Sequence, residues 1–192
     1  TQEYINWLMD DDFFYPTKLE KMMRIYQEND NIALVTSARN IIDGSGKLID
    51  TIQKTPRDAI IRGSDIGGWL LQKQDNCIGE PTTVLMRKSL LKNGKFGWRK
   101  WVNDAYQYSA IIDIETWLHL STQGDIAFIA EPLSAFRKHD GQDQKKNEVI
   151  SNSWINWYEL IKYAYEQKIF LTNSQELLIA LKNYNDNMKR IS

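Results

Sequence analysis

Three consecutive aspartates near the start of the chain are the residues whose type and spacing most directly suggest chemistry. Asp10, Asp11 and Asp12 follow the apolar run 4–9 and precede Pro16. Carboxylates a few ångströms apart repel one another and raise each other's pKa, so a triplet favours a compensating cation. Asp oxygens are hard ligands that suit Mg²⁺ or Mn²⁺, commonly with a substrate phosphate completing the coordination. The triplet predicts a metal and phosphate site; the alternative is a solvated acidic turn.

The composition limits the classes of protein to which this chain can belong. Its 192 residues are 42% hydrophobic and 26% charged, as in an ordinary globular domain with a real core. The net charge of −1 gives no global reason to bind nucleic acid or an anionic membrane. Cys77 is the only cysteine, which excludes an intrachain disulfide and a Cys-based zinc site and favours a reducing compartment. We expect a cytoplasmic location.

Hydrophobic periodicity and turn residues predict the elements that must position the aspartates. We expect extended segments over 4–9, 32–37, 38–42, 48–52, 82–86 and 126–129, and helices over about 17–29, 64–71 and 113–123. The second and third extended segments lead into a hairpin turn over 43–46. A capping box of Thr17 and Glu20 should begin the first helix. Either Ser64 or Asp65 should cap the second helix. Asp113 should cap the third helix, and Gly124 should end it.

The last part of the chain has a different pattern. Residues 138–148 are polar and predict a loop, and after them aromatic and apolar residues recur at helical spacing from Trp154 to Tyr165 and from Leu177 to Met188. Two amphipathic helices joined near Thr172 are therefore expected. Their aromatic stripe indicates either core packing or a docking surface, through which the chain could form a homo-oligomer.

Four sequence blocks, in this order, resemble the family 2 glycosyltransferases of the GT-A fold. The blocks are the Asp triplet before Pro16, the run Ile78-Gly79-Glu80-Pro81-Thr82-Thr83-Val84, the run Asp113-Ile114-Glu115-Thr116-Trp117-Leu118, and Glu131-Pro132-Leu133 with Arg137-Lys138-His139. The resemblance extends from Tyr4 to about Gln142. It implies an α/β fold with a mixed sheet flanked by helices, and it matches only the second half of the family's catalytic domain. Residues 1–148 would then be a partial GT-A domain without its nucleotide-binding half, and 149–192 a helical extension.

The resemblance also implies roles for the acidic turn. Aligned on Pro16, Asp11 matches the family's metal-ligating aspartate, and Asp10 and Asp12 match positions close to the donor. Met9 stands where the commonest form of the motif has an aspartate, so this is a degenerate variant. The implied cofactor is Mn²⁺ or Mg²⁺, and the implied donor is a nucleotide sugar, a UDP-sugar first of all.

Asp113 matches the family's catalytic base. Inversion at the anomeric carbon requires that the acceptor hydroxyl lose its proton as it attacks, and a positioned carboxylate can take that proton. Glu115 is the alternative base or an acceptor contact, although it lies about 200° around a helix from Asp113. A purely structural helix cap is the alternative role for Asp113.

The remaining implied site residues lie in two blocks and one basic stretch. His139 matches a histidine that contacts metal or diphosphate, and Arg137 could pair with the diphosphate. Glu80 could hydrogen-bond an acceptor sugar, and Trp98 could stack on it. His119 is expected to be structural.

The function implied is a metal-dependent, inverting transfer of a sugar to a hydroxyl of a glycan, lipid-linked or protein acceptor. It would serve bacterial surface polysaccharide or glycoconjugate synthesis, in the cytoplasm or peripherally at the inner face of the membrane. Two alternatives remain open. The chain could be a non-catalytic acceptor-binding or assembly module, or a metal-dependent phosphohydrolase that uses the Asp triplet.

Overall fold

The chain folds as an α/β protein in which one mixed sheet is flanked by helices. The computed structural model describes residues 2–91, 110–139 and 147–190. In this part of the chain the sheet contains β1 (Tyr4–Ile5), β2 (Phe13–Phe14), β3 (Ile32–Ile42), β4 (Leu48–Ile52), β5 (Ala59–Ile61), β6 (Leu85–Arg87) and β7 (Asp125–Arg137). The main order is β1-β6-β3-β7-β2, with β4 paired to β3 and β5 to β7. Among the strand pairs of the described residues, β3 and β7 run parallel and the other pairs antiparallel.

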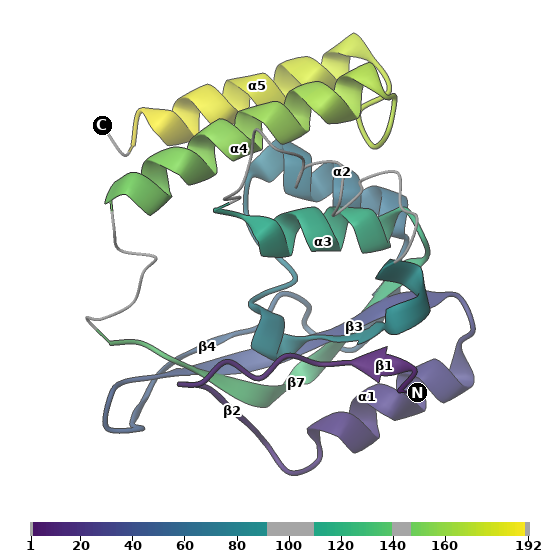
Figure 1. Ribbon diagram of the computed structural model, residues 1–192, viewed down its shortest axis with the longest axis vertical. Coiled ribbons are helices and arrows are strands. Elements are labelled where there is room, and N and C mark those ends of the chain that lie inside the picture. Colours follow the sequence, from purple (N-terminus) through teal and green to yellow (C-terminus); the bar gives the residue numbers. More distant parts are fainter. Residues whose placement is uncertain (1, 92–109, 140–146, 191–192) are drawn as a thin grey trace.

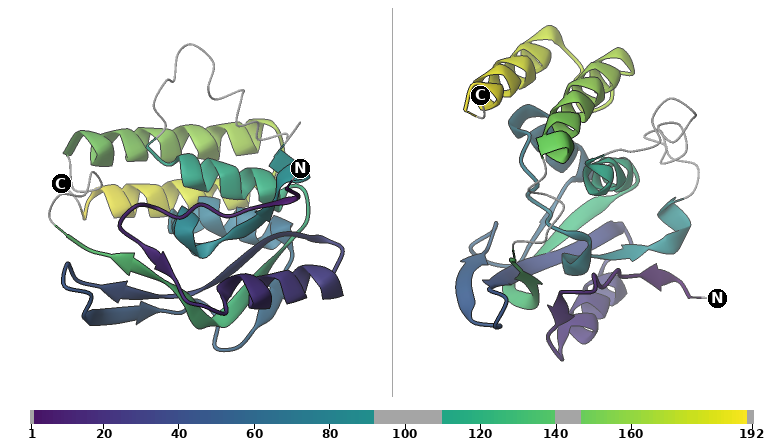
Figure 2. Two further views of the ribbon diagram at one scale, coloured as in Figure 1. Left: turned by 60° about the horizontal axis from the view of Figure 1, so that its bottom comes forward. Right: turned by 60° about the vertical axis from the view of Figure 1, so that its left-hand side comes forward.

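The helices form layers on the two faces of this sheet. They are α1 (Lys18–Glu28), α2 (Gly63–Lys73), α3 (Ile112–Ser121), α4 (Asn147–Glu166) and α5 (Ser174–Met188), with short 3₁₀ turns η1 (Pro81–Thr83) and η2 (Lys88–Leu91). Helix α1 covers one face, and α2 and α3 cover the other (Figure 1). Helices α4 and α5 form an outer layer beyond α2 and α3, as Figure 1 and the right-hand view of Figure 2 show.

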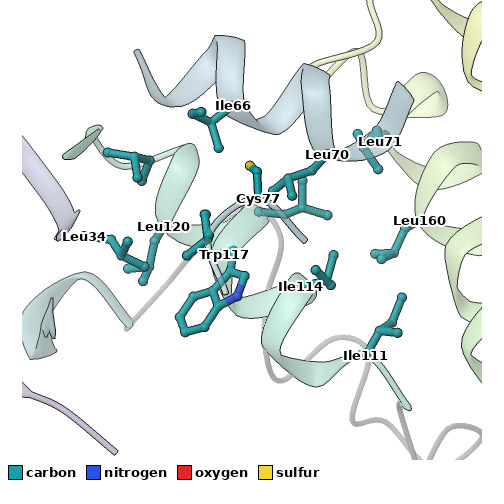
Figure 3. Close-up of a cluster of buried hydrophobic side chains, with 14 of the residues drawn as sticks. Leu34, Ile66, Leu70, Leu71, Cys77, Ile111, Ile114, Trp117, Leu120 and Leu160 are labelled. Atoms are coloured by element: carbon teal, nitrogen blue, oxygen red, sulfur yellow. The ribbon is translucent and has the colours of Figure 1, made fainter. Parts of the chain in front are cut away.

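Two hydrophobic cores hold these layers together. The smaller joins α1 to the sheet through Met22, Tyr26, Val35, Leu85 and Ile129. The larger lies between the sheet and the other helices, and Figure 3 shows part of it: α2 contributes Ile66, Leu70 and Leu71, α3 contributes Ile114, Trp117 and Leu120, and α4 contributes Leu160. The α4–α5 pair therefore shares its core with the α/β layers.

The predicted hairpin and the terminal helices are confirmed. Strands β3 and β4 pair antiparallel, and the intervening turn is closed by the bond from the Gly46 N–H to the Asp43 carbonyl. The two C-terminal helices are joined across Thr172, as the periodicity predicts. Of the predicted polar loop, residues 140–146 lie outside the described part of the chain, and α4 already begins at Asn147.

The strand predicted over 4–9 is wrong beyond Ile5. Strand β1 has only two residues, and Leu8 and Met9 are 54% and 45% exposed instead of buried. Pairing between β1 and β6 ends at Ile5. At the next residue, the Asn6 side chain donates to the Val84 carbonyl in place of a backbone hydrogen bond between the strands. The residues that lead into the acidic turn are therefore irregular and partly exposed.

The first helix starts where the sequence predicts it, whereas the second and third start two or three residues earlier than predicted. Thr17 precedes α1 but makes no side-chain capping bond, α2 begins at Gly63 behind Arg62, and Ile111 rather than Asp113 precedes α3. Helix α3 ends at Ser121, before Gly124. A Cβ at Gly124 would meet the Asn31 carbonyl at 2.4 Å, so this glycine permits close backbone contact instead of capping the helix.

Two predicted strands have different bounds. Thr82 and Thr83 belong to η1, because Pro81 begins a 3₁₀ turn there, and the strand starts at Leu85. The strand expected over 126–129 continues to Arg137 through Pro132, because its second part pairs with β3 and with β2.

The outer surface of α4 and α5 carries exposed apolar side chains. Ile155, Tyr158, Leu178 and Ile179 are each at least 40% exposed, and the rings of Tyr158 and Trp154 both contact Tyr184. In the described part of the chain, none of the helices has the length and apolar character needed to cross a membrane. The homo-oligomer through these helices stays a prediction.

Candidate active site

The structure brings Asp11 and His139 together from opposite ends of the sequence block that resembles a catalytic domain. Asp11 Oδ2 and His139 Nε2 are 2.8 Å apart, although 128 positions separate the two residues. The contact follows from the sheet, because Phe13 and Phe14 of β2 pair with Ala135 and Ser134 of β7, which sets the turn before β2 beside the end of β7. Both side chains are about one third exposed, at 31% and 39%, so a ligand can reach them.

Asp12 points the other way, into the protein. Its Oδ2 accepts a 2.6 Å bond from Thr82 Oγ1, and its Oδ1 accepts a bond from the Arg137 backbone N–H. Burial raises the pKa of the Asp12 carboxyl, and these two hydrogen bonds oppose that effect. Asp12 therefore orders the acidic turn against η1 and β7, while Asp10 is exposed.

Arg137 connects the acidic turn with the hairpin turn between β3 and β4. Its Nε donates to the Asp11 carbonyl at 3.0 Å, and its Nη1 donates to the carbonyls of Asp43 and Gly44. The guanidinium thus contacts backbone oxygens from two turns. This arrangement fixes the backbone that carries Asp11, and it is a structural use of the arginine for which the sequence suggested a diphosphate contact.

Asp113 lies in the first turn of α3, with both carboxylate oxygens hydrogen-bonded. Asn76 Nδ2 donates to Oδ2 at 2.9 Å, and the Ile114 backbone N–H donates to Oδ1 at 2.9 Å. Burial raises the pKa of Asp113 to about 6, the Glu80 charge acts in the same direction, and the Ile114 bond opposes them. A carboxylate with this pKa is mostly ionised at pH 7 and is a better proton acceptor than an ordinary aspartate.

The charge of Glu80 acts on both parts of the candidate site, the acidic turn and Asp113. Its negative charge raises the pKa of both Asp12 and Asp113. Its carboxylate is held by the guanidinium of Arg39, whose Nη2 donates to Oε1 at 3.0 Å and whose Nε contacts Oε2. Arg39 is buried in β3, so the carboxylate of Glu80 compensates a buried cation.

The other predicted site residues have different surroundings. Glu115 is buried on α3, at 6% exposure, and Trp98 lies outside the described residues. His119 is buried, and its Nε2 contacts the Leu90 carbonyl at 2.7 Å, which agrees with the structural role expected for it.

Three residues that join the site were not predicted as site residues from the sequence: Arg39, Asn76 and Thr82. An arginine within an apolar strand was a signal, because a buried cation needs a partner. Asn76, three positions before Gly79, was another, because asparagine commonly bonds the backbone of a following turn. Thr82 had no signal apart from the motif around it.

Asp11 and His139 supply one carboxylate oxygen and one imidazole nitrogen, a donor set that suits Mn²⁺. Within the described ranges, no group of three or more His, Cys, Asp or Glu side chains could hold a metal ion. These two residues would therefore need further ligands from a substrate phosphate or from water.

In comparisons with known proteins, no family model matches the chain, and no curated protein sequence matches it significantly.

Proposed function

We propose that this chain carries the metal and acceptor side of an inverting glycosyltransferase of the family 2, GT-A type. The enzyme transfers a sugar from a nucleoside-diphosphate donor, a UDP-sugar first of all, to a hydroxyl of a glycan, lipid-linked or protein acceptor. The expected pathway is bacterial surface polysaccharide or glycoconjugate synthesis. The proposal rests on one observation above all, the contact between Asp11 and His139 at 2.8 Å.

That contact supports the proposal because neither residue has a local reason to meet the other. The resemblance assigns both to the metal and diphosphate. They come from segments far apart in the sequence, which the β2–β7 pairing and the bonds from Arg137 to the acidic turn bring together. Asp11 and His139 would hold the metal ion between them, and the donor diphosphate would complete its coordination. When bound, such an ion neutralises charge on the departing diphosphate.

Asp113 supplies the base in this proposal. Its raised pKa, about 6, matches the ionisation a general base needs near neutral pH. The carboxylate accepts the proton of the acceptor hydroxyl as that oxygen forms its bond to the anomeric carbon and the bond to the nucleoside diphosphate breaks. The sign of the pH dependence follows directly: activity falls as the pH drops below about 6, because protonated Asp113 cannot accept a proton.

The proposal is tested in the complete enzyme that contains this chain, since the chain alone is expected to lack the nucleotide-binding half. Sugar transfer from UDP-sugars is assayed with and without chelator, together with calorimetric binding of UDP and Mn²⁺. We expect EDTA to abolish transfer, Mn²⁺ to restore it, and Asp113→Asn to lower kcat at least 100-fold with donor binding retained. Asp11→Asn and His139→Ala should each weaken binding of Mn²⁺ with UDP at least tenfold. Asp30→Asn, an exposed aspartate in the turn after α1, is the matched control and should change neither quantity.

Each alternative function gives a different result in the same assays. Full transfer in excess chelator, or an Asp113→Asn variant as active as the parent, contradicts the mechanism. Acceptor binding without binding of UDP and Mn²⁺ would indicate a non-catalytic module instead. Chelator-sensitive release of phosphate from a simple ester such as p-nitrophenyl phosphate would indicate a phosphohydrolase.

A further inference from the structure

Asn76 is the residue outside the predicted motifs that most directly contacts the candidate base. It lies in the loop between α2 and η1, and its Nδ2 donates to Asp113 Oδ2 at 2.9 Å. The same nitrogen donates to the Gly79 carbonyl at 3.0 Å, and its Oδ1 accepts a bond from the Gly79 N–H at 2.9 Å. Because the amide oxygen accepts the Gly79 N–H, the orientation of the amide is fixed, and its two N–H groups are directed at the Gly79 carbonyl and at the Asp113 carboxylate.

The loop around Asn76 is built so that this side chain cannot easily turn away. Gly79 has a φ of +110°, and a Cβ there would meet Thr83 Oγ1 at 2.7 Å. The Gly79 carbonyl accepts a second bond from Trp117 Nε1 at 3.1 Å. Since Trp117 is on α3, as Asp113 is, the loop is anchored to the helix that carries the carboxylate it contacts.

We propose that Asn76 is a positioning residue that holds the Asp113 carboxylate in one rotamer and in its ionised form, with the remaining lone pairs available to an acceptor hydroxyl. This inference rests on the proposed function. A neutral amide donor suits the role, because it stabilises the carboxylate by a hydrogen bond without forming an ion pair that would make Asp113 too weak a base.

The charged groups around Asp113 agree with this role. From the loop before η1, Glu80 faces it and is already paired with Arg39 of β3. Asp75, next to Asn76 in the chain, is paired with Lys54 at 2.9 Å. Among the described residues, two groups hydrogen-bond to the Asp113 carboxylate, the side-chain amide of Asn76 and the backbone N–H of Ile114. A hydrogen bond to a carboxylate favours its ionised form.

The test measures the ionisation of Asp113 directly, by ¹³C NMR of its carboxyl carbon, with the signal assigned by its loss in Asp113→Asn. We expect Asn76→Ala to raise the pKa of Asp113 by about one pH unit, because a hydrogen bond to a charged group contributes about that much free energy. Asn76→Asp, which keeps the acceptor for the Gly79 N–H, should raise it further, because it sets a second carboxylate beside the first. It also provides a second measurement if Asn76→Ala folds poorly.

The pH dependence of sugar transfer provides a second, independent measurement of the Asp113 pKa. In Asn76→Ala the acidic limb of kcat should move upward by the same amount, and kcat at pH 7 should fall at least tenfold while the KM for the donor is unchanged. Asn183→Ala, which removes a bond to Gln72 on the α2–α5 side, should leave transfer unchanged.

Two outcomes separate this inference from the proposed function. An unchanged Asp113 titration in both Asn76 variants overturns the inference, whether or not the parent transfers sugar. A shifted titration, together with a full-length enzyme containing this chain that binds no UDP and transfers no sugar, leaves the Asn76–Asp113 hydrogen bond standing and contradicts the proposed function instead.

Discussion

Lys18 gives a prediction about stability that does not depend on the function. Its side chain is completely buried at the start of α1, where Nζ donates to the Thr83 carbonyl at 2.8 Å, contacts Met22 Sδ at 3.5 Å and lies 5.1 Å from the centre of the Phe14 ring. Burial lowers the pKa of Lys18 from 10.5 to about 7. The folded protein therefore favours the neutral amine.

The sign of the effect follows from proton binding. Between pH 7 and pH 10.5 the unfolded chain holds the Lys18 proton and the folded chain has largely lost it, so the free energy of unfolding rises with pH in this window. Each pH unit of complete difference corresponds to about 1.4 kcal/mol. Because Lys18 is still half protonated in the folded state at pH 7, the expected increase from pH 7 to pH 9 is about 2 kcal/mol.

Two other buried groups set the upper end of the window. Burial raises the pKa of Cys77 to about 12 and also raises that of Tyr26. Above pH 9 the unfolded chain releases these protons before the folded chain does, so both groups lower stability there. Below pH 9 these opposing contributions are small, so the Lys18 contribution dominates the change in stability between pH 7 and pH 9.

Lys18→Met tests this reasoning, since methionine fills a similar volume without a charge. We expect urea unfolding, followed by tryptophan fluorescence at pH 7, 8 and 9, to show that the stability of the variant relative to the parent falls by about 2 kcal/mol across the range. Lys21→Met, on the same helix but partly exposed, is the control and should parallel the parent. A constant difference between Lys18→Met and the parent at all three pH values would refute the lowered pKa.

Two further predictions concern backbone geometry. Gly79→Ala should lower the free energy of unfolding by about 3 kcal/mol, because the φ of +110° disfavours a side chain and the new Cβ would lie 2.7 Å from Thr83 Oγ1. Urea titration measures the loss, and unchanged stability would contradict the loop geometry. Asn173→Ala should cost about 1 kcal/mol, because Asn173 and Glu176 form a complete capping box at the start of α5; the exposed Gln175→Ala is the control, and equal stability of the two variants would contradict the cap.

The parts of the fold that the sequence could predict are those with strong local patterns. The β3–β4 hairpin has its turn residues between two apolar runs, and α4 and α5 have long helical periodicity. Helix starts were less predictable, because the residues that precede α2 and α3, Arg62 and Ile111, are not usual capping residues, and the polar candidates Ser64 and Asp113 lie inside the helices. Thr17 fits the capping-box pattern but makes no capping bond, whereas Asn173 forms the box.

In the candidate site, too, residues in sequence motifs could be predicted, whereas contacts between distant segments could not. Asp11, Asp113 and His139 belong to recognisable blocks, and the structure adds that the first and last are in contact. The bonds from Asn76 to Asp113 and from Arg39 to Glu80 join segments 37 and 41 positions apart, and no local pattern encodes such pairs. They depend on how α3 and β3 pack around one loop.

The contact between Asp11 and His139 also has a consequence for how the chain folds. The side-chain partners that fix the acidic turn, Thr82, Arg137 and His139, lie 70 to 128 positions further along the chain. The turn thus acquires its order only after β7 has joined the sheet, which is a slow kind of closure. A metal ion that bound both Asp11 and His139 would then act as a clip across one of the longest loops in the chain, and ligand occupancy and folding would be thermodynamically linked.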